Sequence, residues 1–228
     1  MHSPAVRTSI LNWYPVQRWC SSDLGNIAYG IAAVQFDPGV LCGLPDVALV
    51  MACATDNRER LALLKALVRV YEDAISALVT VHVDVWSFSE KGVPLDTDRT
   101  ARALKPRLLA LDRDHGPFDE ALYEFQMNKN DKTRVVSSFL RYHYAGVCVT
   151  RKIGGSLKNT VTLAPHLDHR LFLRKYASPY TANKKHAAAS LEYLASVWKF
   201  SIAHIDPSVL KDAGDALMQL WALKFRKT

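Results

Sequence analysis

The acidic residues best spaced to bind a cation lie near the end of the 228-residue chain. Asp212 and Asp215 are three residues apart in a stretch with helical apolar spacing, so their carboxylates share one helix face. That face adjoins the stripe of Leu217 and Leu220, so we expect the pair to point inward. Like charges at this spacing repel each other unless a cation or a base lies between them. The alternative is that the pair only interacts favourably with the dipole at the helix N-terminus.

Two other carboxylates stand where a metal ligand would fit. Glu124 lies within an apolar strand predicted over 120–127, where burying a lone carboxylate is costly, unless the strand is an exposed edge. Asp23 precedes a glycine and the strand predicted over 27–36, a position that suits a ligand or a turn residue. Asp37, in an Asp-Pro-Gly turn, is the substitute for Asp23.

Carboxylates that converge from distant segments are suited to hard divalent cations. Oxygen ligands select Mg²⁺, and Mn²⁺ can substitute. Two such cations ~3.5–4 Å apart stabilise the attacking and leaving oxygens of a phosphodiester. Three or four of the carboxylates Asp23, Glu124, Asp212 and Asp215, with Asp37 as the rival of Asp23, could therefore form a catalytic site that holds two divalent cations.

The positive charge of the chain is concentrated in its second half. The net charge is +7, and residues 129–185 contain twelve basic and two acidic side chains with aromatic residues among them. Such a surface favours a polyanion such as nucleic acid, although a solvated basic face is the alternative. Together with the carboxylates, this charge predicts a nuclease. The sequence lacks both glycine-rich nucleotide fingerprints and the G-x-S-x-G motif of serine hydrolases.

The order of the expected elements predicts an α/β fold with a mixed central sheet flanked by helices. The whole chain is expected to form one nuclease domain with a helical insertion near 55–80. Apolar periodicity predicts strands over 27–36, 47–54, 79–88, 120–127 and 147–150, and helices over 57–78, 98–112, 131–144 and 184–198. The stretch 151–183 is expected to be rich in loops, and a last helix is expected to begin at Pro207 with Asp206 as its N-cap.

The cellular setting is predicted from what the sequence lacks. It has no apolar run of about 18 residues and no secretory signal, so we expect no membrane association. Its four cysteines are far apart, which fits a reducing, intracellular compartment.

Four segments resemble the Holliday junction resolvases of large DNA viruses, the RuvC-like enzymes of poxviruses and iridoviruses. The first is DLGNIAYGI (23–31), and the second is YEFQMNKNDKTRVVSSFLRYHY (123–144). The third is SLKNTVTLAP (156–165) with FLRKYASPYTANKKHAAASLEYL (172–194), and the fourth is LKDAGDALMQLWA (210–222). The similarity is nearly continuous over 120–222, and the stretch 37–78 is longer than the family pattern.

This resemblance implies a ribonuclease H-like fold and a homodimer that cuts opposing strands of a four-way DNA junction. By position, it implies that Asp23, Glu124, Asp212 and Asp215 bind the metal. It further implies DNA contacts from basic and amide side chains in the matched segments: Lys132, Arg134, Lys158, Asn183, Lys184 and Lys185. The expected location is a site of viral DNA replication in the host cell.

Two other functions fit the same residues. A restriction-like nuclease would use Glu124-x-Gln126 with Asp112 or Asp114, and would not need the aspartates of the last helix. A catalytically silent protein that binds branched DNA would show strong salt dependence and no metal requirement.

Overall fold

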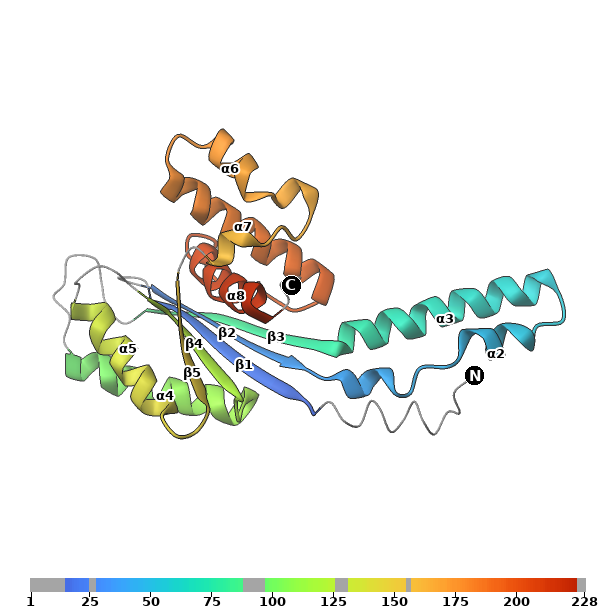
Figure 1. Ribbon diagram of the computed structural model, residues 1–228, viewed down its shortest axis with the longest axis horizontal. Coiled ribbons are helices and arrows are strands. Elements are labelled where there is room, and N and C mark those ends of the chain that lie inside the picture. The colour runs from blue at the N-terminus through green and yellow to red at the C-terminus, as the bar shows by residue number, and fades with distance from the viewer. Residues whose placement is uncertain (1–14, 25–27, 88–96, 126–130, 155–156, 225–228) are drawn as a thin grey trace. The chain divides into compact units, whose positions relative to one another are not determined.

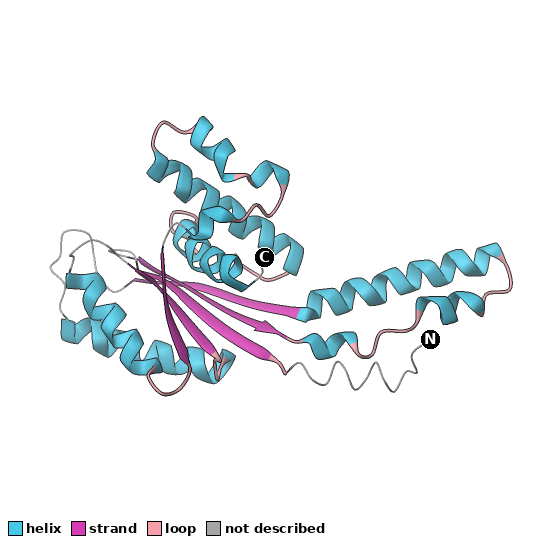
Figure 2. Cartoon of the chain, viewed as in Figure 1, coloured by secondary structure: helices cyan, strands magenta, loops and turns pink. Residues whose placement is uncertain are grey.

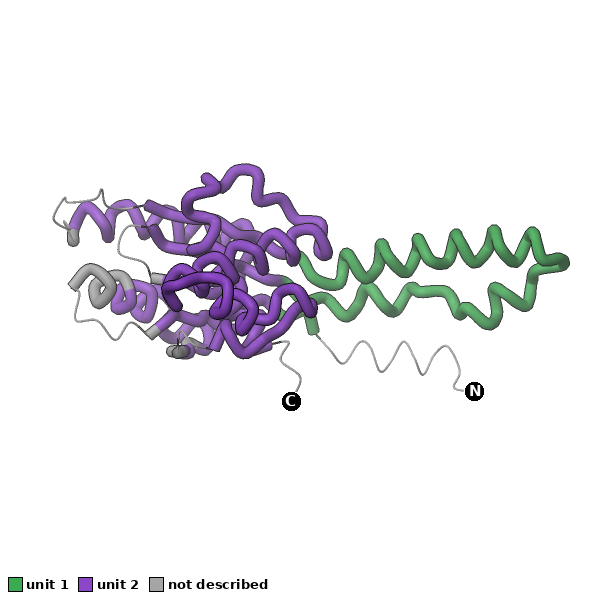
Figure 3. The backbone as a smooth tube through the Cα atoms, turned by 90° about the horizontal axis from the view of Figure 1, so that it is seen from above, with its two compact units in different colours: residues 1–17, 35–80 green, residues 18–34, 81–228 purple. Residues whose placement is uncertain are grey.

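A computed structural model describes residues 15–24, 28–87, 97–125, 131–154 and 157–224 of the chain. Two compact units are formed, one from residues 1–17 and 35–80 and the other from residues 18–34 and 81–228 (Figure 3). The strands are β1 (Gln17–Leu24), β2 (Ala28–Phe36), β3 (Val79–Ser87), β4 (Glu120–Phe125) and β5 (Val149–Gly154). The longer helices are α3 (Asn57–Leu78), α4 (Thr97–His115), α5 (Asp131–Tyr144), α7 (Pro179–Trp198) and α8 (Leu210–Lys224). The shorter ones are η1 (Pro38–Leu41), α2 (Val47–Ala52), η2 (Leu157–Thr160), η3 (Pro165–Leu167) and α6 (His169–Lys175).

The strands form a five-stranded sheet in the order β3-β2-β1-β4-β5. β1, β4 and β5 run parallel to one another. Only three residues separate β1 from its neighbour β2, and a connection that short joins antiparallel strands. The amide of Asp37 donates to the carbonyl oxygen of Leu78 at 2.9 Å, so β2 ends beside the start of β3 and this pair is antiparallel as well. The sheet is therefore mixed, as predicted.

Helices of the second unit cover both faces of the sheet (Figures 1 and 2). α4 and α5 lie on one face, and α8, with α7 and α6, lies on the other. Side chains of successive strand residues point to opposite faces, so each strand contributes to both layers. The core on the α4–α5 side is formed by Cys20, Tyr29, Ile31, Ala33, Trp86, Leu104, Leu108, Leu111, Phe118, Ala121, Leu140 and Tyr144.

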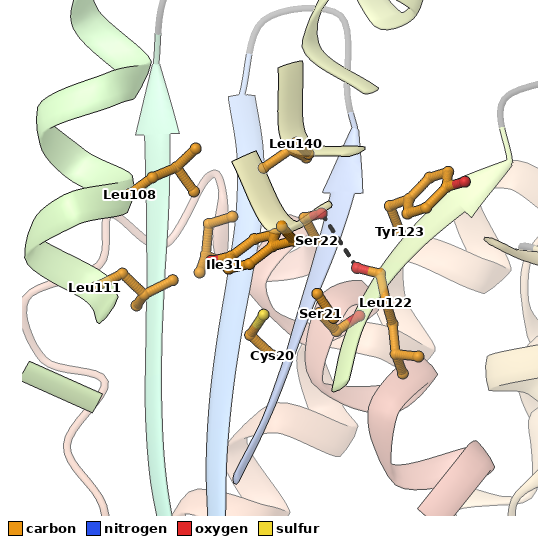
Figure 4. A pocket seen from close by; sticks show the side chains of 11 residues that line it. Cys20, Ser21, Ser22, Ile31, Leu108, Leu111, Leu122, Tyr123 and Leu140 are labelled. Carbon is orange, nitrogen blue, oxygen red and sulfur yellow. Dashed lines mark hydrogen bonds between the residues drawn. The ribbon is translucent and has the colours of Figure 1, made fainter. Parts of the chain in front are cut away.

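A small cavity remains within this unit (Figure 4). Its lining includes Cys20 and Ile31 from the strands and Leu108 and Leu140 from the helices. Its volume is about 10 Å³, which is near the minimum for one water molecule. This space is a packing gap and is too small for a substrate.

The helices of the first unit show one correct and one wrong prediction. α3 has the predicted bounds because its apolar residues recur at helical spacing and the Asp56 side chain accepts a hydrogen bond from the amide of Glu59. The strand predicted over 47–54 is wrong, because this segment contains the helix α2. The Asp46 carboxylate accepts hydrogen bonds from the amides of residues 48 and 49, and this N-cap starts the helix.

Most other predicted elements are present, with shifted ends, but the apolar pattern does not predict β1, whose sequence is only weakly apolar. The expected loop-rich stretch 151–183 contains α6 and the start of α7, which begins at Pro179. The last helix begins at Leu210 and not at Pro207, and the Asp206 carboxylate accepts a hydrogen bond from the amide of Ser208 in the turn before it. Of the helices that the structure describes, none has both the length and the apolar composition to span a bilayer.

Candidate metal centre

Two neighbouring strands bring the first two predicted carboxylates together. β1 and β4 are parallel, with Trp19 opposite Glu120 and Ser22 opposite Tyr123. The next position in this register pairs Asp23 with Glu124, at the edge where the carboxyl ends of both strands lie. A side-chain hydrogen bond joins the two carboxyl groups. β4 is an interior strand, so the alternative of an exposed edge does not hold.

Helix α8 supplies the other two carboxylates. Asp212 and Asp215 lie one turn apart near its start, and both are buried, with Asp215 fully inaccessible. The expectation that this pair points inward is confirmed. One carboxylate oxygen from each of Asp23, Asp212 and Asp215 takes part in a group whose members all lie within 4.8 Å of one another. A helix dipole alone does not require this burial, since it also stabilises exposed acidic residues.

Two glycines allow α8 to reach this position. A Cβ on Gly30 of β2 would lie 1.8 Å from the backbone oxygen of Asp212, so only glycine permits the helix to approach the strand this closely. A Cβ on Gly214 would lie 2.3 Å from the backbone oxygen of Ala187 on α7. The same contact brings α7 against α8, and α7 then supplies a lysine to the carboxylates.

Two lysines contact the carboxylates directly. Lys184 Nζ lies 2.5 Å from Asp215 Oδ2, 3.1 Å from Asp212 Oδ1 and 3.8 Å from Asp23 Oδ2. Lys158 Nζ, from η2, lies 2.7 Å from Asp215 Oδ1. The two lysines therefore contact three carboxyl groups, and Lys211 adds a weaker attraction at Asp212. Glu124 joins this group only through its hydrogen bond with Asp23.

The electrostatics of the group follow from burial and close charges. Burial, and then the hydrogen bond with Glu124, raises the pKa of Asp23 to about 7. Burial also raises the pKa of Asp212, although the attraction of Lys184 opposes this. For Lys184, burial disfavours the ammonium form, but Asp215 and Asp23 outweigh it and raise the pKa.

A glutamine that the sequence analysis missed orients Glu124. Gln219 is fully buried on α8, one turn beyond Asp215. Its amide nitrogen donates to Glu124 Oε2 at 3.1 Å, and its oxygen accepts from the Ser21 hydroxyl at 3.3 Å. The sequence could have indicated Gln219 through its spacing, because a residue four positions after Asp215 shares the same helix face.

The structure places the predicted DNA-contacting residues in different surroundings. Lys158 and Lys184 belong to the carboxylate group, and Lys185 is exposed on α7. Asn183, also on α7, contacts His169 Nε2 through its side-chain oxygen at 2.6 Å. Lys132 and Arg134 are on α5, and their side chains lie outside the described residues.

The acidic residues of the alternative assignments make contacts outside the carboxylate group. Asp37 caps η1 by accepting a hydrogen bond from the amide of Gly39. Asp112 contacts His143 and Tyr144, and Asp114 pairs with Arg113. Gln126 lies outside the described residues.

Only one group of three or more described residues is spaced to bind a metal ion, and it consists of Asp23, Asp212 and Asp215. These carboxylate oxygens could hold a metal ion. The chain matches no known family model, no curated protein and no solved structure.

Proposed function

We propose that the protein is a Mg²⁺-dependent endonuclease with a ribonuclease H-like fold that resolves four-way DNA junctions. The observation that carries the proposal is the convergence of Asp23, Asp212 and Asp215, from opposite ends of the chain, with buried oxygens within 4.8 Å of one another. The strand order and the parallel direction of β1, β4 and β5 are compatible with the fold that the resemblance implies.

Burial of several carboxylates in one place calls for a physical explanation. Removing charged groups from water is costly, and like charges at short range add to the cost. Lys158 and Lys184 offset part of this charge, but they contact three carboxyl groups, and Lys211 attracts only Asp212, more weakly. Such an arrangement is retained more readily where divalent cations supply the missing positive charge. Divalent cations held by Asp23, Asp212 and Asp215 would supply this charge, and they would activate water and stabilise the leaving 3′-oxygen of a phosphodiester.

The remaining residues have roles that follow from their contacts. Asp23 and Glu124 are hydrogen-bonded in the metal-free chain, and a bound divalent cation would hold the Asp23 carboxylate in its ionised form. Gln219 fixes the orientation of Glu124 through a buried amide. Lys158 and Lys184 hold the α8 aspartates in place and present positive charge beside them, where a phosphate would be attracted.

The DNA substrate is supported by the charge distribution and by the resemblance. Residues 129–185 carry most of the excess positive charge, which would give salt-dependent binding to phosphates. Lys185, exposed one residue after Lys184, is placed to contribute to such contacts. The four-way junction comes from the resemblance alone.

The test is cleavage of an end-labelled four-way junction in Mg²⁺ by the full chain and by Asp215→Asn. We expect the variant to lose cutting by at least about 10³-fold while junction binding, measured by fluorescence anisotropy, is retained. Asp206→Asn is the matched control, since Asp206 is exposed shortly before the same helix and lies outside the carboxylate group. Normal cutting by Asp215→Asn would support the restriction-like alternative. Metal-independent binding with no cutting by the unmodified chain would support the silent DNA-binding protein.

A further inference from the structure

We propose that the outer apolar stripe of α3 is a self-association surface, and that two copies of the chain pair through it as an antiparallel coiled coil. The outer stripe consists of Leu61, Leu64, Val68 and Ile75. The proposal does not depend on the nuclease activity, and α3 lies outside the four segments that carry the resemblance.

The apolar face of α3 is wider than the surface that its neighbours cover. At about 100° per residue, the apolar positions of α3 span roughly half of the helix circumference. Leu67 and Tyr71, on one half of this arc, are buried or half-buried in a unit where α3 packs against α2 and η1, and the Tyr71 hydroxyl donates to the Pro45 oxygen at 2.9 Å. The outer stripe occupies the other half, and each of its side chains is between 45% and 54% exposed.

The spacing of the outer stripe is that of a coiled coil. Leu61, Leu64 and Val68 are three and four residues apart, and Ile75 follows one heptad after Val68. Half-buried Tyr71 occupies the heptad position between Val68 and Ile75. A repeat of 3.5 residues keeps such a seam facing a partner helix, and at about 33 Å α3 is long enough for three heptads. In the described part of the chain, no residue buries these four side chains.

The charged residues beside the outer stripe indicate that the partner is α3 of a second copy, in antiparallel orientation. Lys65 and Glu72 are exposed and flank the outer stripe on the same side, seven residues apart. In heptad terms both are at position e when Leu61 is at position a. When Val68 packs against Tyr71 of the other copy in an antiparallel pair, Lys65 of each copy faces Glu72 of the other. The two-fold axis therefore produces two identical ion pairs. In a parallel pair these residues do not face each other.

The first experiment compares two valines of one helix in the full chain. Val68 and Val70 are 48% and 45% exposed, but two residues rotate the helix by about 200°, so Val70 lies away from the outer stripe. By light scattering on size-exclusion peaks over a range of concentrations, we expect the unmodified chain to be a dimer. Val68→Glu should raise the dimer dissociation constant by ~100-fold, because a charge would be buried in the seam, and Val70→Glu should leave it within about threefold. A chain that stays monomeric, or equal effects of the two substitutions, would overturn the proposal.

The second experiment tests the direction of pairing. Lys65→Glu and Glu72→Lys each replace two attractive contacts with two repulsive ones, and each should weaken its own dimer by about tenfold. An equimolar mixture of the two variants restores both attractive contacts in a heterodimer, so its dissociation constant should return to that of the unmodified chain. A mixture as weak as the separate variants would contradict antiparallel pairing. Both positions are exposed in the single chain, so circular dichroism should be unchanged.

Discussion

Replacing Asp23 with asparagine should stabilise the metal-free protein while abolishing its proposed activity. The folded-state pKa of Asp23 is raised to about 7 from the usual 3.8, first by burial and then by the hydrogen bond with Glu124. Between these two pH values, the folded protein holds a proton that the unfolded chain has lost. The free energy of unfolding therefore falls as the pH rises through this window, and the stability is fully present only below it.

The size of this effect follows from the shift. One pKa unit corresponds to about 1.4 kcal/mol, so about three units give an upper estimate of ~4 kcal/mol at pH 8. The attraction of Lys158 and Lys184 is already included, since it lowers the same pKa. An asparagine side chain cannot ionise, so the Asp23→Asn variant should be more stable than the unmodified chain at pH 8 by up to this amount. Near pH 4, where Asp23 is protonated in the folded protein, the two should be nearly equal.

The assay is urea unfolding followed by circular dichroism in the presence of a chelator, from pH 4 to pH 8. Asp212 has a pKa raised by burial as well, so both proteins will lose stability with rising pH, and the readout is the difference between them. Equal slopes for the two proteins, or a variant that is less stable at pH 8, would refute the assignment of Asp23 as a buried carboxyl group with a raised pKa.

Three further substitutions probe how the site is built. Gly30→Ala should destabilise the fold by about 2–4 kcal/mol in urea unfolding and abolish cutting, because its Cβ would collide with the backbone of α8. Lys184→Met should cost about 3 kcal/mol because it leaves buried carboxylates uncompensated, whereas Lys185→Met, at the exposed neighbouring position, should stay within ~0.5 kcal/mol. Gln219→Leu should leave Glu124 without its amide donor and lower the cutting rate by at least about tenfold with the fold retained, and an unchanged rate would remove Gln219 from the site.

The parts of the fold that sequence reasoning predicts well are those with a strong period or a clear cap. α3 combines apolar residues at helical spacing with an Asp56 cap. β3 has valine at every second position from Val79 to Val85. The segment 47–54 is short and uniformly apolar, so its period cannot distinguish a strand from a helix, and the Asp46 cap decides the outcome. A cap can also mislead, since Asp206 closes a turn before α8 begins.

For the site, sequence reasoning identifies the carboxylates but not the contacts that hold them. Asp212 and Asp215 have a helical spacing and Glu124 interrupts an apolar strand, and both are local signals. The approach of Lys184 depends on the packing of α7 against α8 at Gly214, and no pattern near Lys184 indicates it. The resemblance assigns Lys158 and Lys184 to phosphate contacts, whereas the structure pairs both lysines with the aspartates of α8.

The most direct test of the proposed metal centre is an anomalous diffraction map from crystals of the full chain soaked in Mn²⁺. We expect a strong peak coordinated by oxygens of Asp23, Asp212 and Asp215, with Glu124 beside it through its hydrogen bond to Asp23, and no such peak in Asp215→Asn crystals. A map in which Mn²⁺ binds only elsewhere, with the Lys184 ion pairs intact, would contradict it.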